Sequence, residues 1–222
     1  MKYTSSKIAG TEMFLRYPLD DIIGKSIKET GYWEKDLTNF IICSETLKHR
    51  RGSIIDIGAH VGYFSTIFGY YSNEMVFAFE PVKEYYDILC ENTRNQRNVI
   101  ALNYGIDDYN IGSSIIYKSK NNTGDNSLSL EEIKKYNESY EIENIYTKGV
   151  DFISSLTEVS LIKIDTQGSE EKIFNDILIQ QPVGEKRIYI VEVYDNEKFR
   201  KEIHEQAINV LFETEFDIVF EI

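Results

Sequence analysis

Cysteine and basic side chains are scarce in this sequence, and each shortage excludes a class of protein. Two cysteines in 222 residues cannot build a disulfide framework. Both lie in helix-like segments, so we expect Cys43 and Cys90 to be buried, reduced thiols. Lysine and arginine number 24 against 37 Asp and Glu, which leaves a formal charge of −13 and no basic stripe. This balance argues against unaided binding of nucleic acid or of an anionic membrane.

Long apolar runs are lacking as well. No stretch approaches the roughly 18 apolar residues that a membrane span needs. The first ten residues, MKYTSSKIAG, contain no apolar core of a secretory signal, so we expect a cytoplasmic protein. His49 and His204 have no partners at metal-ligand spacing, and the sequence therefore predicts no metal site. With 42% apolar residues, the chain still has the material for a core.

Short apolar runs alternate with segments of helical periodicity along most of the chain. The expected strands are at 53–57, 75–79, 99–102, 161–165, 187–193 and 216–220. Helices are expected between them, including one at 34–48 and a last one from about 196 to 211. This alternation predicts an α/β fold, a doubly wound and mostly parallel sheet of the Rossmann-like kind, with helices on both faces.

The chain shows no repeat and no linker. We therefore expect one domain over residues 34–222, preceded by an extension of residues 1–33 that packs on it. Residues 105–160, between the third and fourth core strands, are too long for an ordinary connection and form an insertion. Its polar centre, 118–141, is either a mobile surface excursion or a lid over the active site.

The strongest local signal is the segment DIGAHVG at 56–62. A strand that ends in glycine and turns sharply into a helix brings bare backbone close to a ligand, and the start of the helix offers N–H groups to it. The glycines are spaced G-x-x-x-G and not G-x-G-x-x-G, which argues against a nicotinamide oxidoreductase. Asp56 can accept a hydrogen bond from an ammonium group, which favours a zwitterionic ligand.

Glu80 strengthens this signal. It ends the second strand, 24 residues after Asp56, where doubly wound folds place the acid that binds two ribose hydroxyls. The alternative is an acid that only faces the dipole of the next helix. Acids at the ends of the first two strands, without a dinucleotide loop, indicate a nucleoside cofactor that lacks phosphates. S-adenosylmethionine fits this description.

From about Gly31 to its C-terminus, the chain resembles the FkbM family of class I methyltransferases. The matching segments are GYWE at 31–34, DIGAHVGYFS at 56–65, FEP at 79–81, DNSL at 125–128, VD at 150–151, LIKIDTQGSE at 161–170 and VEV at 191–193. The K-I-D-x-x-G-x-E pattern within the sixth segment is the most specific of them. One departure is His60, where the family commonly has Asn; we interpret His60 as part of the loop geometry and not as a catalytic base.

The resemblance implies methyl transfer from S-adenosylmethionine to oxygen, often a hydroxyl of a sugar or of a small natural product. The acceptor is then a small molecule or a glycan, and not a nucleic acid. A binding or scaffold module that keeps the fold without catalysis is the alternative. The cofactor-binding residues that we expect are Glu34, Asp56, Gly58, Ala59, His60, Gly62, Glu80, Asn126 and Ser127. Of these, Asn126 and Ser127 rest on the resemblance alone. For Glu34, the resemblance implies a role on the side of the cofactor or of the substrate, and a helix-start acid beside aromatic residues is the alternative.

The expected catalytic residues are Lys163, Asp165 and Glu192. Strand alternation places Lys163 and Asp165 on one face, and Glu192 ends the strand that we expect beside them. A general base would help a sugar hydroxyl to attack, and Asp165 is our candidate. Pairing of Lys163 with Asp165 alone would weaken that base, whereas a share of the lysine's charge taken by Glu192 would free it. The alternative is an ion-pair cluster with a structural role only.

Overall fold

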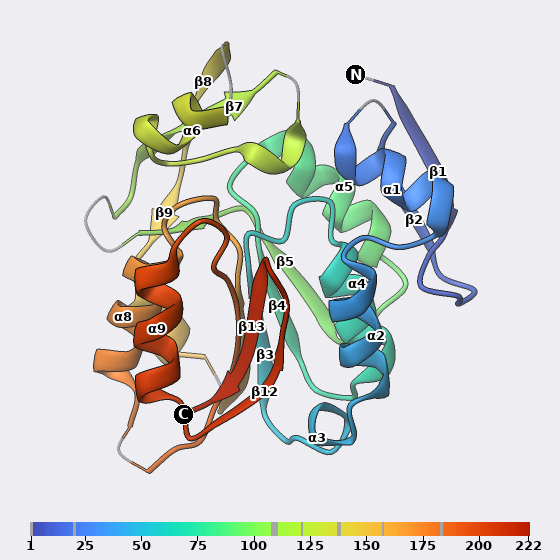
Figure 1. The fold of residues 1–222 in the computed structure, drawn as a ribbon. Coiled ribbons are helices and arrows are strands. Elements are labelled where there is room, and N and C mark those ends of the chain that lie inside the picture. Colours follow the sequence, from blue (N-terminus) through green and yellow to red (C-terminus); the bar gives the residue numbers. More distant parts are fainter. Residues whose placement is uncertain are drawn as a thin grey trace.

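The computed structural model describes residues 2–19, 21–107, 111–120, 122–136, 139–156, 158–182 and 184–222. Over these residues, the centre of the molecule is a seven-stranded sheet in the order β12-β13-β11-β10-β3-β4-β5 (Figure 1). Its parallel strands are β3 (Ser53–Ile57), β4 (Val76–Phe79), β5 (Val99–Leu102), β10 (Val159–Ile164) and β11 (Ile188–Glu192). The antiparallel pair β12 (Asn209–Glu213) and β13 (Asp217–Glu221) completes one edge. The predicted α/β fold with a mostly parallel sheet is confirmed.

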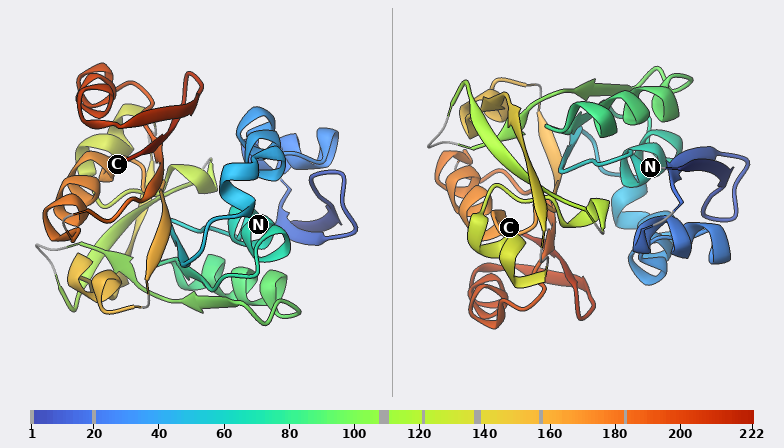
Figure 2. Two further views of the ribbon diagram at one scale, coloured as in Figure 1. Left: turned by 90° about the horizontal axis from the view of Figure 1, so that it is seen from below. Right: turned by 90° about the horizontal axis from the view of Figure 1, so that it is seen from above.

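Helices cover both faces of the sheet, as the left view of Figure 2 shows. On one face lie α2 (Lys35–Cys43), α4 (Tyr63–Tyr71) and α5 (Lys83–Thr93). The other face packs against α7 (Val150–Ser154), α8 (Glu170–Gln180) and α9 (Glu197–Gln206). Alternation along β3 sends Ile54 into the first layer and Ile55 and Ile57 into the second, which is why the strand is buried throughout.

The last helix is shorter than the sequence pattern predicts. It ends at Gln206, and the residues up to Leu211 that were expected to continue it lie instead in β12 (Asn209–Glu213) or just before it. The residues Val210-Leu211-Phe212 favour a strand when a partner is available, and β13 supplies that partner. Phe212 also stacks on Phe40 of α2, with ring centroids 4.7 Å apart. Tertiary pairing therefore overrides the helical spacing.

The helix expected at 34–48 is likewise interrupted. Ser44 has an extended backbone (φ −70°, ψ 112°) that ends α2, and its side chain accepts a hydrogen bond from Leu47 N at the start of α3 (Glu45–Lys48).

The expectation of buried thiols is wrong for Cys43, which is exposed at the end of α2, and only partly right for the half-buried Cys90. Cys43 lies at the frayed end of the helix, beyond the buried positions Leu37 and Ile41.

The N-terminal residues form a hairpin of β1 (Tyr3–Lys7) and β2 (Phe14–Pro18), followed by α1 (Ile22–Thr30). Leu15 and Tyr17 are fully buried in the same core as α4 and α5. Arg16 is fixed to α5 through its backbone, which exchanges hydrogen bonds of 2.8 and 2.9 Å with the Asn92 side chain.

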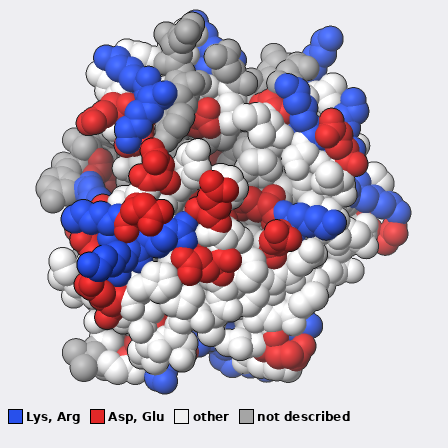
Figure 3. Space-filling view, viewed as in Figure 1, with Lys and Arg blue, Asp and Glu red and all other residues white. Residues whose placement is uncertain are grey.

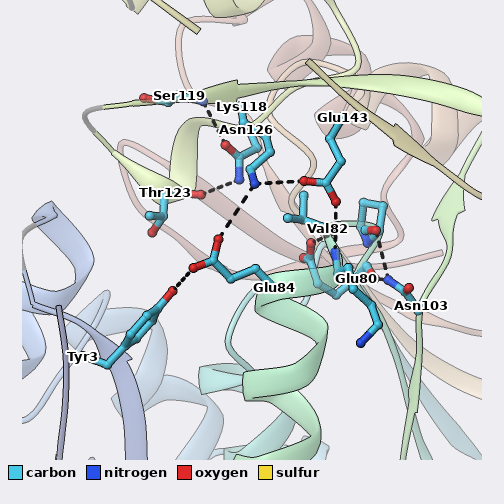
Figure 4. A network of polar contacts seen from close by, with 12 residues as sticks. Tyr3, Glu80, Val82, Glu84, Asn103, Lys118, Ser119, Thr123, Asn126 and Glu143 are labelled. Atoms are coloured by element: carbon cyan, nitrogen blue, oxygen red, sulfur yellow. Dashed lines mark hydrogen bonds and ion pairs between the residues drawn. The ribbon is translucent and has the colours of Figure 1, made fainter. Parts of the chain in front are cut away.

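The insertion forms a ribbon that lies across the carboxyl edge of the sheet (Figure 2, right view). Its elements are β6 (Gly105–Ile106), β7 (Ser114–Ser119), the 3-10 turn η1 (Thr123–Asp125), α6 (Leu130–Tyr136), β8 (Tyr140–Ile145) and β9 (Thr147–Lys148). Lys118 ties the ribbon to α5, because its Nζ lies 2.9 Å from Glu143 of β8 and 3.9 Å from Glu84 of α5 (Figure 4). None of the helices in the described part of the chain is long and apolar enough to cross a membrane.

Candidate active site

A cavity of about 950 Å³ lies at the carboxyl edge of the sheet, beneath the insertion. The strand order reverses at β3, with β4 and β5 on one side and β10 and β11 on the other. Ligands of doubly wound sheets bind in the crevice at such a switch point. The volume is at the upper end of the range for small-molecule sites, roughly 300–1,000 Å³, which leaves room for a cofactor and a second molecule.

All but two of the predicted site residues line this cavity. Those that do are Glu34, Asp56, Gly58, Ala59, His60, Glu80, Asn126, Lys163, Asp165 and Glu192. The exceptions lie behind the lining. Gly62 starts α4 against α5, where a Cβ would lie 2.5 Å from Leu89 Cδ1. Ser127 is buried, and its Oγ donates a 2.5 Å hydrogen bond to the carbonyl oxygen of Gln167, so it links the insertion to the loop after β10.

The loop after β3 is shaped by Gly58, which has a φ of +85°. A Cβ at this position would lie 1.7 Å from the carbonyl oxygen of Asp165. Glycine therefore permits the loops that carry Asp56 and Asp165 to touch. The N–H groups of Gly58 and Ala59 in this loop donate to Phe79 O, at 3.0 and 2.9 Å, and that of Gly62 at the start of α4 donates to Ala59 O, at 2.8 Å. Gly58 therefore serves the close approach of the two loops.

Asp56 lines the cavity, and only 1% of it is exposed. Its Oδ2 accepts a 2.5 Å hydrogen bond from Ser65 Oγ, whereas its buried Oδ1 has no partner among the residues that the structure describes. Burial raises the pKa of Asp56, and the charge of Lys163, its cross-strand neighbour in the β3–β10 register, opposes that rise. A buried acceptor without a donor is costly unless a ligand supplies one, and an ammonium group would.

Glu80 ends β4 and closes the same side of the cavity. Its two oxygens accept hydrogen bonds from His60 N (2.9 Å) and Val82 N (2.8 Å), so each oxygen keeps a lone pair for a ligand hydroxyl. Asn103 Nδ2 fixes this turn by donating to the carbonyl oxygens of Glu80 and Pro81 (Figure 4). Burial raises the pKa of Glu80 to about 8.

His60 lies in the loop between β3 and α4. Its backbone is left-handed (φ +50°), and its ring centroid lies 4.7 Å from that of Tyr85. Burial lowers the pKa of His60 to about 4, so the imidazole is neutral at physiological pH. On the far side of the loop, Asn126 Oδ1 accepts a 3.0 Å hydrogen bond from Ser119 N, which holds η1 over the cavity (Figure 4).

Lys163 and Asp165 form an ion pair at the end of β10, with 2.7 Å between Nζ and Oδ2. Only 2% of the lysine side chain is exposed, and its Nζ also lies 4.8 Å from the centre of the Phe64 ring. Burial alone would lower the pKa of Lys163, but the neighbouring Asp165 and Asp56 carboxylates raise it instead. Burial would likewise raise the pKa of Asp165, but the charge and hydrogen bond of Lys163 hold it below its ordinary value. This is the pairing that keeps Asp165 ionised and makes it a weaker base.

Two residues that the sequence did not single out complete this end of the cavity. Gln167 Nε2 donates to both Asp165 Oδ1 (2.9 Å) and Glu192 Oε2 (2.7 Å), and so bridges the two carboxyls. Asp217, the first residue of β13, stands opposite Glu192 in the antiparallel β11–β13 register and is buried. Burial raises the pKa of Asp217 to about 7 and that of Glu192 well above its usual range.

Glu34 faces this group from the start of α2. Its backbone is left-handed (φ 41°), its side chain does not cap the helix, and its buried Oε2 has no hydrogen-bond partner within the described part of the chain. Burial and the nearby Asp217 and Asp165 raise the pKa of Glu34 well above its usual range. Glu170 does not line the cavity, and its oxygens accept hydrogen bonds from Thr166 and Gly168. The described residues include no group of three or more His, Cys, Asp or Glu side chains placed to hold a metal ion.

The family model for the methyltransferase FkbM domain matches residues 56–218, which is most of the chain. The chain belongs to the FkbM methyltransferase family. The cofactor predicted from the sequence, S-adenosylmethionine, is thereby supported as the methyl donor, and the unpartnered Asp56 oxygen and the two lone pairs of Glu80 suit its ammonium group and ribose hydroxyls. No curated protein sequence matches the chain.

Similar solved structures share the fold at low sequence identity. A putative transferase from Pyrococcus horikoshii has a TM-score of 0.54 and 11% identity, and this chain covers 70% of it. TYW2 of M. jannaschii, in complex with AdoMet, has a TM-score of 0.50, 12% identity and 84% coverage. aTrm5, in complex with tRNALeu, has a TM-score of 0.51 and 11% identity, and the chain spans 52% of its length. Each comparison covers 99% of this chain.

Proposed function

We propose that this chain is an O-methyltransferase that methylates a hydroxyl group of a sugar or glycoconjugate. The proposal is carried by the position of Asp165. On one side of Asp165 the cavity contains Asp56 and Glu80, the acids at the cofactor motif. On its other side is open volume that is bordered by β11 and β13. Carboxyls along that volume are suited to accept hydrogen bonds from a polyol and to repel phosphates, which disfavours a nucleic-acid acceptor.

The cofactor half of the site orients the donor. When bound, S-adenosylmethionine supplies an electrophilic methyl group. Asp56 Oδ1 would accept a hydrogen bond from its ammonium group, and Glu80 would accept from the ribose hydroxyls. His60 and Val82 fix the Glu80 oxygens in advance, so little ordering is left for the binding step.

Asp165 serves the acceptor. It would hold the attacking hydroxyl and receive its proton while the new C–O bond forms and the C–S bond breaks. Lys163 keeps Asp165 ionised at neutral pH and limits its strength as a base. Positioning of the two reactants and exclusion of water therefore supply much of the acceleration, with Asp165 adding a general-base contribution.

Transfer of a labelled methyl group tests the proposal. The protein is incubated with methyl-labelled S-adenosylmethionine and a panel of free sugars and glycosides, and the products are treated with mild alkali. We expect label in a sugar in an alkali-stable form, as a methyl ether is and a methyl ester is not. Label on nitrogen, on RNA or on protein in place of a sugar hydroxyl would refute O-methylation of a glycan.

A further inference from the structure

The two halves of the cavity differ in what they offer a ligand. The cofactor motif occupies the ends of β3 and β4. The other half is bounded by the ends of β10 and β11, the start of β13 and the start of α2. Four of the carboxyls that line it, which we call the acid row, are Glu34, Asp165, Glu192 and Asp217.

The acid row contains more carboxyl groups than the lining offers cations. Of the described residues that line the cavity, Lys35 and Lys163 are the only lysines or arginines. Lys163 is already paired with Asp165, and Lys35 is exposed, with its Nζ 5.5 Å from the centre of the Tyr32 ring. Arg200, which attracts Asp217 from outside the lining, is bonded to Glu213. Three carboxyls of the acid row therefore have no cation of their own in the lining.

Glu34 gives independent evidence that a ligand binds at the acid row. Its Oε2 is buried and has no partner among the described residues, although its helix-start position would let a side chain cap α2. Buried polar atoms are nearly always hydrogen-bonded, and an exception inside a cavity is best explained by a donor that a ligand brings.

Aromatic rings border the same half of the cavity. Tyr194 follows β11 and Phe216 precedes β13, and their rings are stacked with centroids 5.2 Å apart. They are 49% and 44% exposed, so part of each ring is open to solvent. Aromatic faces attract ammonium groups and also stack on the apolar faces of sugars. Figure 3 shows acidic side chains across the middle of this side of the molecule, with lysine and arginine side chains beside them.

We propose that the methyl acceptor is a polyhydroxylated amine, such as an amino sugar, whose protonated amine binds the acid row while a neighbouring hydroxyl faces Asp165. This inference rests on the proposed function and names its substrate class. The bound ammonium group favours the ionised form of these carboxyls, and they in turn keep the amine protonated, so it has no lone pair with which to attack. The hydroxyl is then the nucleophile. Anionic acceptors are repelled, and a neutral sugar leaves the buried carboxyls without a counter-charge.

Calorimetric titration of the full chain saturated with S-adenosylhomocysteine tests this with matched probes. The probes are glucosamine and galactosamine, their N-acetyl forms, glucose, and glucuronic acid. We expect at least one free amine to bind about tenfold or more tightly than its N-acetyl form, and glucuronic acid not to bind. Binding of N-acetyl or acidic sugars as tightly as of the amines would overturn the inference, and so would the absence of amine binding to protein that binds S-adenosylhomocysteine.

A variant pair locates the amine. Because Glu34 lies with Asp217 and Asp165 and not at the ends of β3 and β4, Glu34→Gln should weaken amine binding about tenfold or more, and S-adenosylhomocysteine binding much less. The exposed Glu197→Gln should change neither. An unchanged amine affinity in Glu34→Gln would overturn the inference. So would a melting-temperature shift by Mg²⁺ or Ca²⁺ that Glu34→Gln removes, because the acid row would then hold a metal ion. Failure to bind S-adenosylhomocysteine would instead refute the proposed function.

Discussion

Gly58 and Asp165 lie so close that a Cβ on the glycine would be 1.7 Å from the aspartate's carbonyl oxygen. Gly58→Ala therefore has to separate the two loops and also adopt a φ of +85°. We expect a loss of roughly 2–4 kcal/mol in the free energy of unfolding and loss of cofactor binding, measured by urea denaturation and calorimetry. Gly184→Ala is the control. Its φ is +87°. Apart from its chain neighbours, no described atom lies within 4 Å of a Cβ added there, so this substitution should cost only about 1 kcal/mol. Equal costs would show that the loop contact is unimportant.

Glu80→Gln should weaken S-adenosylmethionine binding about tenfold or more. The amide has one acceptor oxygen in place of two, so it cannot serve Val82 N, His60 N and two ribose hydroxyls together. Isothermal titration measures the loss. NAD should bind neither the variant nor the wild type. Tight NAD binding by the wild type would refute the choice of cofactor.

The free protein should become less stable as the pH rises from 6 to 8. Burial raises the pKa of Glu80 to about 8 and that of Asp217 to about 7, whereas both groups ionise near pH 4 when unfolded. The folded protein thus binds more protons than the unfolded chain over this interval. The stability that these two groups contribute is complete below their pKa values in the unfolded chain and is lost as the pH rises through their pKa values in the folded protein. Melting temperatures from pH 5.5 to 8.5 report this slope, and Glu80→Gln should flatten it. A melting temperature that increases over pH 6–8 contradicts it.

Asp165→Asn should keep S-adenosylmethionine affinity within a few-fold and lose most turnover, roughly 100-fold or more for a lost base. The variant leaves the buried Lys163 without its partner, so Lys163→Met combined with Asp165→Asn should restore the stability but not the rate. Single-turnover transfer measures the rate. Turnover near that of the wild type would show that Asp165 is not the base.

Periodicity and strand-end residues predicted the parallel sheet and most of the cavity, because both depend on local sequence. The acids at 56, 80 and 165 lie at or just after the ends of buried strands, and parallel strands bring such ends to one edge. Asp217 had no comparable signal, since it starts an antiparallel strand and reaches the cavity only through its register with Glu192. Gln167 lay unnoticed inside the K-I-D-x-x-G-x-E segment, at a position that the pattern leaves open. The strand at 209–213 was missed because its pairing with β13 is not a local property.

Equilibrium dialysis of labelled S-adenosylmethionine against the wild-type chain and Glu80→Ala tests the cofactor site most directly. We predict one site per chain in the wild type, an affinity at least about tenfold lower in Glu80→Ala, and no competition by NAD. The exposed Glu197→Gln should bind as the wild type does. Absence of binding to the wild type, or equal binding by Glu80→Ala, would contradict the cofactor site at Asp56 and Glu80.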